Sequence, residues 1–168
     1  MKNIIIAGAG KGIGLKTAEI LNGYYNLYTI SRNSSPELAA LNTKFYRLDL
    51  STDNLESLHD LPETIDGLVY CPGSINLKPF NRLTRQDFLD DFNQNVLGAV
   101  GIIQKLLPNL KRANGASIVL FSSVAAKLGM PFHSSIATSK AAIEGLAKSM
   151  AAELALSKIR VNVIAPSV

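Results

Sequence analysis

Short apolar runs alternate with helical patterns along the whole length of this 168-residue chain. Six of the runs read as strands, and they span residues 3–9, 26–31, 44–50, 66–73, 116–123 and 159–166. Several are continuous stretches of Ile, Val and Leu, which is typical of strands that are covered on both faces. Strands and helices in regular alternation predict an α/β fold, a doubly wound parallel sheet between two layers of helices. We expect residues 1–168 to form a single domain.

Two of the helices have clear start signals. "SSPE" predicts a helix that Ser34 caps, with Pro36 in the first turn and Glu37 in capping-box register. "LTRQD" predicts another, with Thr84 as its N-cap and Asp87 at the end of the helix that favours negative charge. We expect this second helix to continue in two segments.

The last helical pattern, residues 135–156, is apolar on nearly every side. A helix of that kind is buried on more than one face. We therefore expect it, and the helix near residues 95–110, to pack on the sheet on one side and on another subunit on the other. The expected assembly is a homodimer or a homotetramer.

Composition and charge narrow the classes of function. Hydrophobic residues make up 47% of the chain and charged residues 18%, which is the balance of a folded globular protein. The net charge of +4 is spread along the chain without a run of Lys and Arg, so we expect no nucleic-acid partner. No apolar stretch is long enough to cross a membrane, and the single cysteine, Cys71, allows no internal disulfide. These features predict a soluble, cytoplasmic protein with no membrane partner.

A glycine-rich turn, "AGAGKGIG", follows the first strand and leads into a helix. Glycines in such a turn let the backbone approach a diphosphate, and the helix N-terminus supplies free N–H donors. Gly8, Gly12 and Gly14 fit the spacing G-x-x-x-G-x-G, whereas the common fingerprint G-x-G-x-x-G fails at Ile13 and the P-loop pattern fails as well. We predict a dinucleotide site here. The alternative is that the glycines only make a tight turn.

The end of the second strand bears on which dinucleotide binds. A free ribose 2′-hydroxyl usually meets an Asp or Glu about 20 residues beyond the glycines. Here no carboxylate lies between Glu19 and Glu37, and the strand ends in Ser31 and Arg32. If Arg32 and Lys11 flank a ribose 2′-phosphate, NADP is favoured over NAD. The alternative is that both are solvated surface charges.

From the glycine turn onward, the chain resembles the short-chain dehydrogenase/reductase family over essentially its whole length. Besides the three glycines, the resemblance rests on "LDL", "YCPG", "NVLG", "IVLFSSVAA", "SKAAIEGLAKSMAAEL" and "IRVNVIAPSV". It implies a Rossmann-like fold with strand order 3-2-1-4-5-6. It also implies an oxidoreductase that transfers hydride between a nicotinamide cofactor and a small carbonyl or alcohol substrate.

The resemblance assigns roles to single residues. Ser123 matches the family's catalytic serine, which orients the substrate oxygen, and Lys140 matches the lysine that binds the nicotinamide ribose. Asn95 matches the asparagine that holds a water between this lysine and solvent, and Asp49 matches the position that contacts adenine. Further cofactor contacts are expected at Gly8, Lys11, Gly12, Ile13, Gly14, Ser31, Arg32, Leu50, Cys71, Gly73, Lys140 and Pro166. No metal site is expected.

The chain departs from the family pattern at the proton donor. The family has a tyrosine four residues before the lysine, which lowers its pKa, but this chain has Ile136 there. The turn "YCPG" and the end "APSV", with Ser167 for the usual glycine, depart as well. Family members commonly continue through a seventh strand. We therefore expect a shortened chain whose last strand, residues 159–166, is an exposed apolar edge.

Three functions stay open. The first, which we favour, is an NADP-dependent oxidoreductase whose proton comes from a water held by Ser123 and Lys140, or from His133, one helical turn before Ile136. The second is an NADP-binding sensor, scaffold or partner subunit without turnover, for which the isoleucine is the main argument. In the third, Ser123 and Asn95 are a loop serine and a capping amide in a domain without a cofactor.

Overall fold

Six parallel strands form one sheet in the order β3-β2-β1-β4-β5-β6, which is the order that the family resemblance implied. They are β1 (Asn3–Ala7), β2 (Asn26–Ser31), β3 (Thr43–Arg47), β4 (Gly67–Tyr70), β5 (Ser117–Phe121) and β6 (Arg160–Ile164). The helices are α1 (Gly12–Leu21), α2 (Pro36–Ala39), α3 (Arg85–Phe92), α4 (Gly98–Arg112) and α5 (Ser134–Leu154). This computed structural model describes residues 1–52 and 54–167. Asp53 and Val168, which belong to the expected domain, lie outside the described residues.

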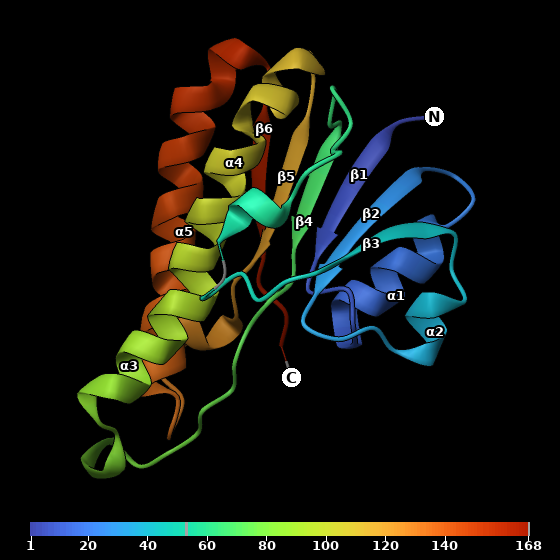
Figure 1. Ribbon diagram of the computed structural model, residues 1–168. Coiled ribbons are helices and arrows are strands. Elements are labelled where there is room, and N and C mark those ends of the chain that lie inside the picture. The colour runs from blue at the N-terminus through green and yellow to red at the C-terminus, as the bar shows by residue number, and fades with distance from the viewer. Residues whose placement is uncertain (53, 168) are drawn as a thin grey trace.

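Helices cover both faces of the sheet (Figure 1). The central strand β1 supplies both cores, because successive side chains of a strand point to opposite faces. Ile5 belongs to the larger core with residues of α4 and α5, and Ile6 belongs to the smaller core with residues of α1 and α2. Both isoleucines are fully buried. The continuous apolar run of β1 is therefore the signature of a strand covered twice.

The strands end earlier than the sequence predicted. β1, β3 and β4 stop at Ala7, Arg47 and Tyr70, so the predicted ends at residues 9, 50 and 73 were wrong by two or three residues. The apolar runs continue past these points, but the pairing between neighbouring strands does not. The residues that follow leave the sheet at the carboxyl ends of the strands, where they line a cavity.

One predicted helix cap is confirmed and the other is wrong by one residue. The Thr84 hydroxyl accepts a hydrogen bond from the N–H of Asp87, and the Asp87 carboxylate accepts one from the N–H of Thr84. At α2, Ser35 rather than Ser34 is the cap, and its hydroxyl accepts from the N–H of Leu38 at 3.2 Å. The proline at the first helical position puts the residue directly before it in the capping place.

The helix after Thr84 continues in two segments, as predicted, and the joint between them is a π-helical turn. α3 ends at Phe92, residues Asn93–Leu97 form the π turn, and α4 begins at Gly98. Such wide turns occur often at functional sites. This one contains Asn95.

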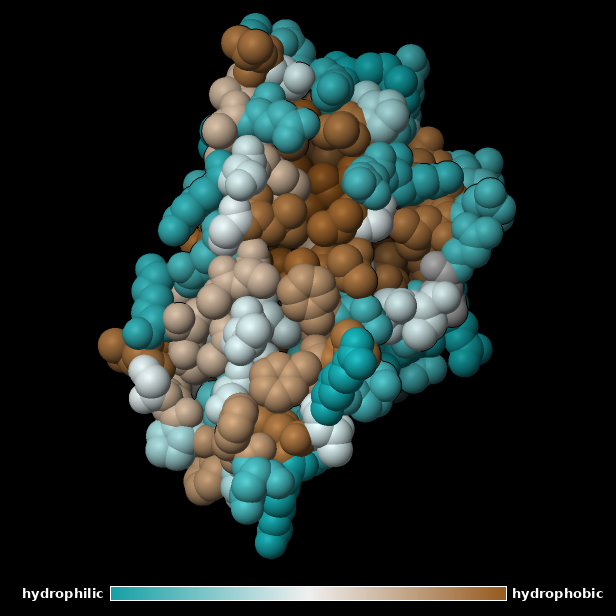
Figure 2. Space-filling view, turned by 90° about the vertical axis from the view of Figure 1, so that its left-hand side faces the viewer, coloured by the Kyte–Doolittle hydropathy of each residue, from teal (hydrophilic) through white to brown (hydrophobic). Residues whose placement is uncertain are grey.

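The strand β6 lies at the edge of the sheet, as predicted, and pairs with β5 alone among the described strands. Its residues alternate between exposed and half-buried, and Ile164 is exposed. Figure 2 views the side of the molecule that carries α5, and apolar side chains gather across the middle of that face. Within the described ranges, no helix is both long and apolar enough to cross a membrane.

Gly14 lies where α1 packs against the turn before it, and Gly145 in α5 provides a control without such packing. A Cβ on Gly14 would lie 2.3 Å from the carbonyl oxygen of Gly8, whereas a Cβ on Gly145 in α5 would have no heavy atom within 4 Å. We expect Gly14→Ala to lower the free energy of unfolding by roughly 2 kcal/mol or more, because backbone must move. Gly145→Ala should raise it by about 1 kcal/mol through helix propensity. Urea unfolding followed by circular dichroism measures both, and equal effects would contradict the close packing.

Candidate active site

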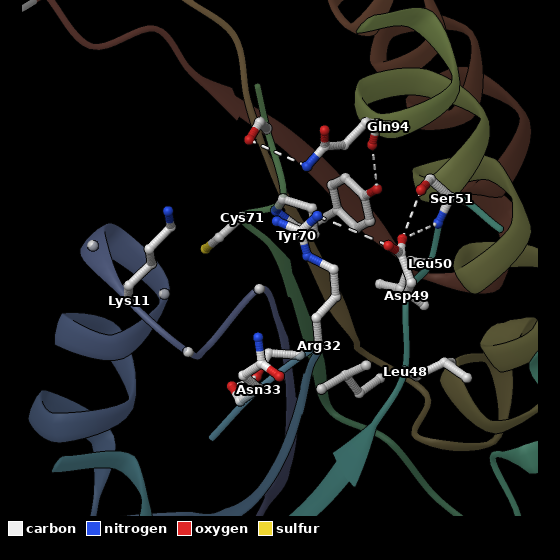
Figure 3. A pocket seen from close by; sticks show the side chains of 18 of the residues that line it. Lys11, Arg32, Asn33, Leu48, Asp49, Leu50, Ser51, Tyr70, Cys71 and Gln94 are labelled. Atoms are coloured by element: carbon white, nitrogen blue, oxygen red, sulfur yellow. Dashed lines mark hydrogen bonds and ion pairs between the residues drawn. The ribbon is translucent and has the colours of Figure 1, made fainter. Parts of the chain in front are cut away.

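A cavity of about 400 Å³ opens where β1, β2, β3 and β4 end (Figure 3). In parallel sheets this edge is where ligands bind. Eleven of the residues predicted to contact a cofactor line the cavity: Gly8, Lys11, Gly12, Ile13, Gly14, Ser31, Arg32, Asp49, Leu50, Cys71 and Gly73. Lys140 and Pro166, which were also predicted, do not line it.

The glycine turn forms the floor of this cavity. Gly8 has a positive φ of 77°, and a Cβ there would lie 2.8 Å from the backbone nitrogen of Pro72. Gly12 also has a positive φ, and a Cβ there would meet no atom within 4 Å. The side chain of Lys11, the residue before α1, makes no capping bond, and the first residues of the helix, Gly12 to Gly14, line the cavity. This geometry suits a diphosphate, which needs close backbone and free N–H donors.

Charged groups of both signs stand at the end of the cavity beside β2 and β3. Arg32 reaches from the end of β2 toward Asp49, and their closest atoms are 3.9 Å apart, which is too long for a hydrogen bond (Figure 3). Partial burial alone would raise the pKa of Asp49, but hydrogen bonds from Ser51 and the charge of Arg32 lower it overall. Lys11 stands across the cavity from them, at the start of α1.

Sequence reasoning missed eight residues of the lining, namely Gly10, Ile30, Asn33, Leu48, Ser51, Tyr70, Pro72 and Gln94. Most are direct neighbours of predicted residues. Gln94 is the direct neighbour of the predicted catalytic residue Asn95, in the π turn. The Tyr70 hydroxyl donates to the carbonyl of Gln94 at 2.6 Å, and the Gln94 side chain donates to the carbonyl of Gly73 at 3.3 Å. Burial, and then the charge of Asp49, raise the pKa of Tyr70, so its hydroxyl stays protonated.

Two of the predicted catalytic residues, Asn95 and Lys140, lie against the same glycine. A Cβ on Gly73 would be 3.3 Å from Oδ1 of Asn95 and 3.5 Å from Nζ of Lys140. Asn95 is 1% exposed, and its Oδ1 has no hydrogen-bond partner within the described part of the chain. The ammonium of Lys140 donates to the carbonyl of Phe121 at 2.9 Å. Burial lowers the pKa of Lys140 to about 8, while Cys71 and Asp91 act in the opposite direction.

The third predicted catalytic residue, Ser123, follows β5 and caps a short 3₁₀ turn. Its hydroxyl oxygen accepts from the N–H of Ala125 at 3.2 Å, which leaves its own proton available for another acceptor. Pro166 lies beside it, since the N–H of Val124 donates to the Pro166 carbonyl at 3.3 Å. The structure thus brings Pro166 to the serine rather than to the main cavity.

The position four residues before Lys140 is apolar and buried. Ile136 is 6% exposed, in the first turn of α5. His133, the other proton donor considered, immediately precedes this helix, and its Nδ1 lies 2.7 Å from the carbonyl of Pro131. That nitrogen is the donor of the pair, because a carbonyl only accepts.

Comparisons with known proteins bear on the family and the fold of this chain. A family model described as short chain dehydrogenase matches residues 2–168. The 2,3-dihydro-2,3-dihydroxybenzoate dehydrogenase of Escherichia coli (strain K12) is 30% identical, and the match covers 98% of this chain and 68% of that protein. A short chain dehydrogenase family protein from Francisella tularensis subsp. tularensis SCHU S4 superposes with a TM-score of 0.89, at 28% identity, over 100% of this chain and 70% of that one. A 4-hydroxyisoleucine dehydrogenase complexed with NADH and succinate superposes with a TM-score of 0.84, at 26% identity, over 98% of this chain and 79% of that one.

The buried ammonium of Lys140 should lower the free energy of unfolding of the protein. Its pKa falls from 10.5 to about 8 on folding, so the folded state disfavours its charged form. We expect Lys140→Met to raise the free energy of unfolding at neutral pH by on the order of 1–3 kcal/mol, less than the pKa shift alone implies because the bond to Phe121 is lost.

The stability difference between wild type and Lys140→Met should depend on pH. Between about 8 and 10.5 the unfolded wild type holds a proton on Lys140 that the folded protein has released, so wild-type stability rises with pH in this window. The advantage of Lys140→Met should therefore shrink there. Lys148→Met, at an exposed position of the same helix, is the control and should change little. Chemical unfolding across this pH range measures the effect, and a Lys140→Met protein less stable at neutral pH would contradict it.

Proposed function

This chain belongs to the short-chain dehydrogenase family and is an oxidoreductase, and from that premise we propose that it uses NADP to interconvert a carbonyl and an alcohol. The observation that carries the proposal is the cavity itself. It combines a glycine turn, an uncapped helix N-terminus and two positive side chains, Lys11 and Arg32, with no carboxylate at the end of β2. A nicotinamide dinucleotide is the ligand that fits such a site.

The choice between NADP and NAD rests on the end of β2. The 4-hydroxyisoleucine dehydrogenase in the comparison binds NADH. Here β2 ends at Ser31 and is followed by Arg32 and Asn33. The Arg32 side chain is 61% exposed, and its ion pair with Asp49 is long, at 3.9 Å. An exposed guanidinium with so loose a partner is free to turn to a 2′-phosphate, which offers it a stronger, bidentate bond. Lys11 adds charge from the opposite side.

When bound, the cofactor supplies or accepts the hydride. The chain's own residues then have separate tasks. Ser123 donates a hydrogen bond from its hydroxyl to the substrate oxygen and thereby orients that oxygen. Lys140 presents its ammonium to the cofactor ribose. Asn95 keeps its Oδ1 open toward the lysine, where a water has a donor on one side and an acceptor on the other.

The proton on the substrate oxygen needs a source other than residue 136. Isoleucine has no exchangeable proton, so we propose a water held between Ser123 and Lys140. The pKa of Lys140, near 8, suits proton exchange with such a water at neutral pH. His133 is the less favoured donor, because its Nδ1 proton is engaged with Pro131.

We also propose that the protein is cytoplasmic and assembles as a homodimer or homotetramer through α4 and α5. The argument for assembly is the run of apolar side chains on the side that carries α5 (Figure 2). The single cysteine is consistent with a reducing compartment.

Cofactor preference provides the first test. We expect NADPH to bind more tightly than NADH. Arg32→Ala should weaken the binding of NADPH by roughly ten- to a hundredfold, because a charge-assisted phosphate contact is lost, and it should have little effect on the binding of NADH. Titrations followed by fluorescence or thermal shift measure both. Arg160→Ala, on β6 at the edge of the sheet, is the matched control. A preference for NADH would overturn the assignment, and no response to either cofactor would overturn the site.

The missing phenol provides the second test. Ile136→Tyr should raise the rate of NADPH oxidation with small ketones by about 10²–10⁴-fold, the usual contribution of a positioned general acid. Ile136→Phe, which adds the ring without the hydroxyl, should not. Equal rates in all three proteins would mean that another group already delivers the proton efficiently. Turnover in the tyrosine variant alone would favour a cofactor-binding protein without catalysis.

A further inference from the structure

Asp91 is a buried acid beside the site that no role proposed above uses. It lies in the last turn of α3 and is 2% exposed, and it is the one charged side chain so fully buried among the residues that the structure describes. A buried carboxylate is costly unless hydrogen bonds and an opposite charge compensate for its lost hydration. The compensation at Asp91 comes from several elements.

Two serine hydroxyls satisfy the carboxylate. Ser74, in the loop after β4, donates to Oδ1, and Ser135, in the first turn of α5, donates to Oδ2 at 2.5 Å. Ser135 also contacts the carbonyl of Asp87 at 3.2 Å. The carboxylate therefore holds α3, α5 and the loop after β4 together at one point.

The same network reaches Asn95. The side-chain amide nitrogen of Asn95 donates to the carbonyl of Asp91 at 2.8 Å and to the hydroxyl of Ser74 at 3.3 Å. Because both amide protons are directed to this side, Oδ1 is directed away from it, against Gly73. The ammonium of Lys140 lies against the same glycine.

The charges around Lys140 leave Asp91 as its counter-charge. Two groups raise the pKa of Lys140 through their charge, Cys71 from the loop after β4 and Asp91 from α3, and the neutral Phe121 carbonyl of β5 accepts its hydrogen bond. Burial raises the pKa of the Cys71 thiol to about 12, so the thiol is uncharged while Lys140 titrates. On α5 itself, Glu144 lies one turn further on, and its carboxylate is engaged with Ser122 and Lys127.

We propose that Asp91 is a positioning residue of the active site, whose carboxylate is the buried counter-charge of Lys140 and, through Ser74, orients the amide of Asn95. The proposal rests on the role proposed for Lys140 in the reaction. It explains why an acid occupies a position that an apolar residue fills at lower cost. It also accounts for the one unpartnered buried side-chain atom among the described residues, since Asn95 Oδ1 is held open by the bonds on its other side.

The titration of Lys140 tests the counter-charge. In protein with isotope-labelled lysine and without cofactor, NMR should place the pKa of Lys140 near 8. Asp91→Asn keeps the shape and removes the charge, so the pKa should fall by on the order of one pH unit. Asp90→Asn, at the exposed neighbouring position, should leave it unchanged. A folded Asp91→Asn protein with the wild-type titration would overturn the proposal.

A second variant tests the counter-charge in case Asp91→Asn does not fold. Asp91→Leu combined with Ser74→Ala and Ser135→Ala removes the charge together with both of its donors, so no buried hydroxyl is left unsatisfied. It should show the same fall in the pKa of Lys140, and an unchanged value would overturn the counter-charge.

The exchange of the Asn95 side-chain amide protons tests the orientation. It should be faster in Ser74→Ala than in wild type, and equal exchange would overturn that half of the proposal. Both readouts use the protein without cofactor, so a failure of cofactor binding would overturn the proposed function and leave these results standing.

Discussion

The turn after β1 joins the two halves of the sheet, and the rest of the site depends on it. The N–H of Gly8 donates to the carbonyl of Ile30 in β2 at 2.7 Å, and the carbonyl of Ala7 accepts from the N–H of Cys71 after β4 at 2.9 Å. Both bonds need the backbone to approach its neighbours closely, and a side chain on Gly8 would meet Pro72. The turn thereby holds the ends of β1, β2 and β4 together at the cavity.

The residues that we propose for the reaction are polar groups withdrawn from much of the solvent. Lys140, Asn95 and Asp91 come from α5, the π turn and α3, and each is partly or wholly buried. Such groups lower the stability of the fold, because their hydration is lost and only partly replaced. Stability given up at a site in this way is the usual sign of function. The hydrogen bonds of Asn95 and Lys140 fix the orientation of both side chains. As a result, Oδ1 of Asn95 and the ammonium of Lys140 both lie against Gly73.

The replacement at residue 136 fits this view of the site. An isoleucine in the first turn of α5 is buried against its neighbours, so the helix keeps its place without the phenol. The surrounding polar residues are retained in position. In the function that we propose, these residues bind the nicotinamide and polarise the substrate oxygen, and the proton comes through water.

Much of this fold could be predicted from the sequence, because it depends on local patterns. The run of isoleucines in β1 indicates a strand covered twice, the glycine spacing indicates a diphosphate turn, and Thr84 with Asp87 indicates a helix start; each is a property of a few adjacent residues. Asp91 was not foreseen, because in the sequence it is one acid among several on a polar helix. Only folding brings Ser74 and Ser135, 17 and 44 residues away, to its carboxylate. The contact of Tyr70 with Gln94 and the early ends of the strands are of the same kind. They depend on which segments become neighbours, and that is decided by the packing of the whole chain.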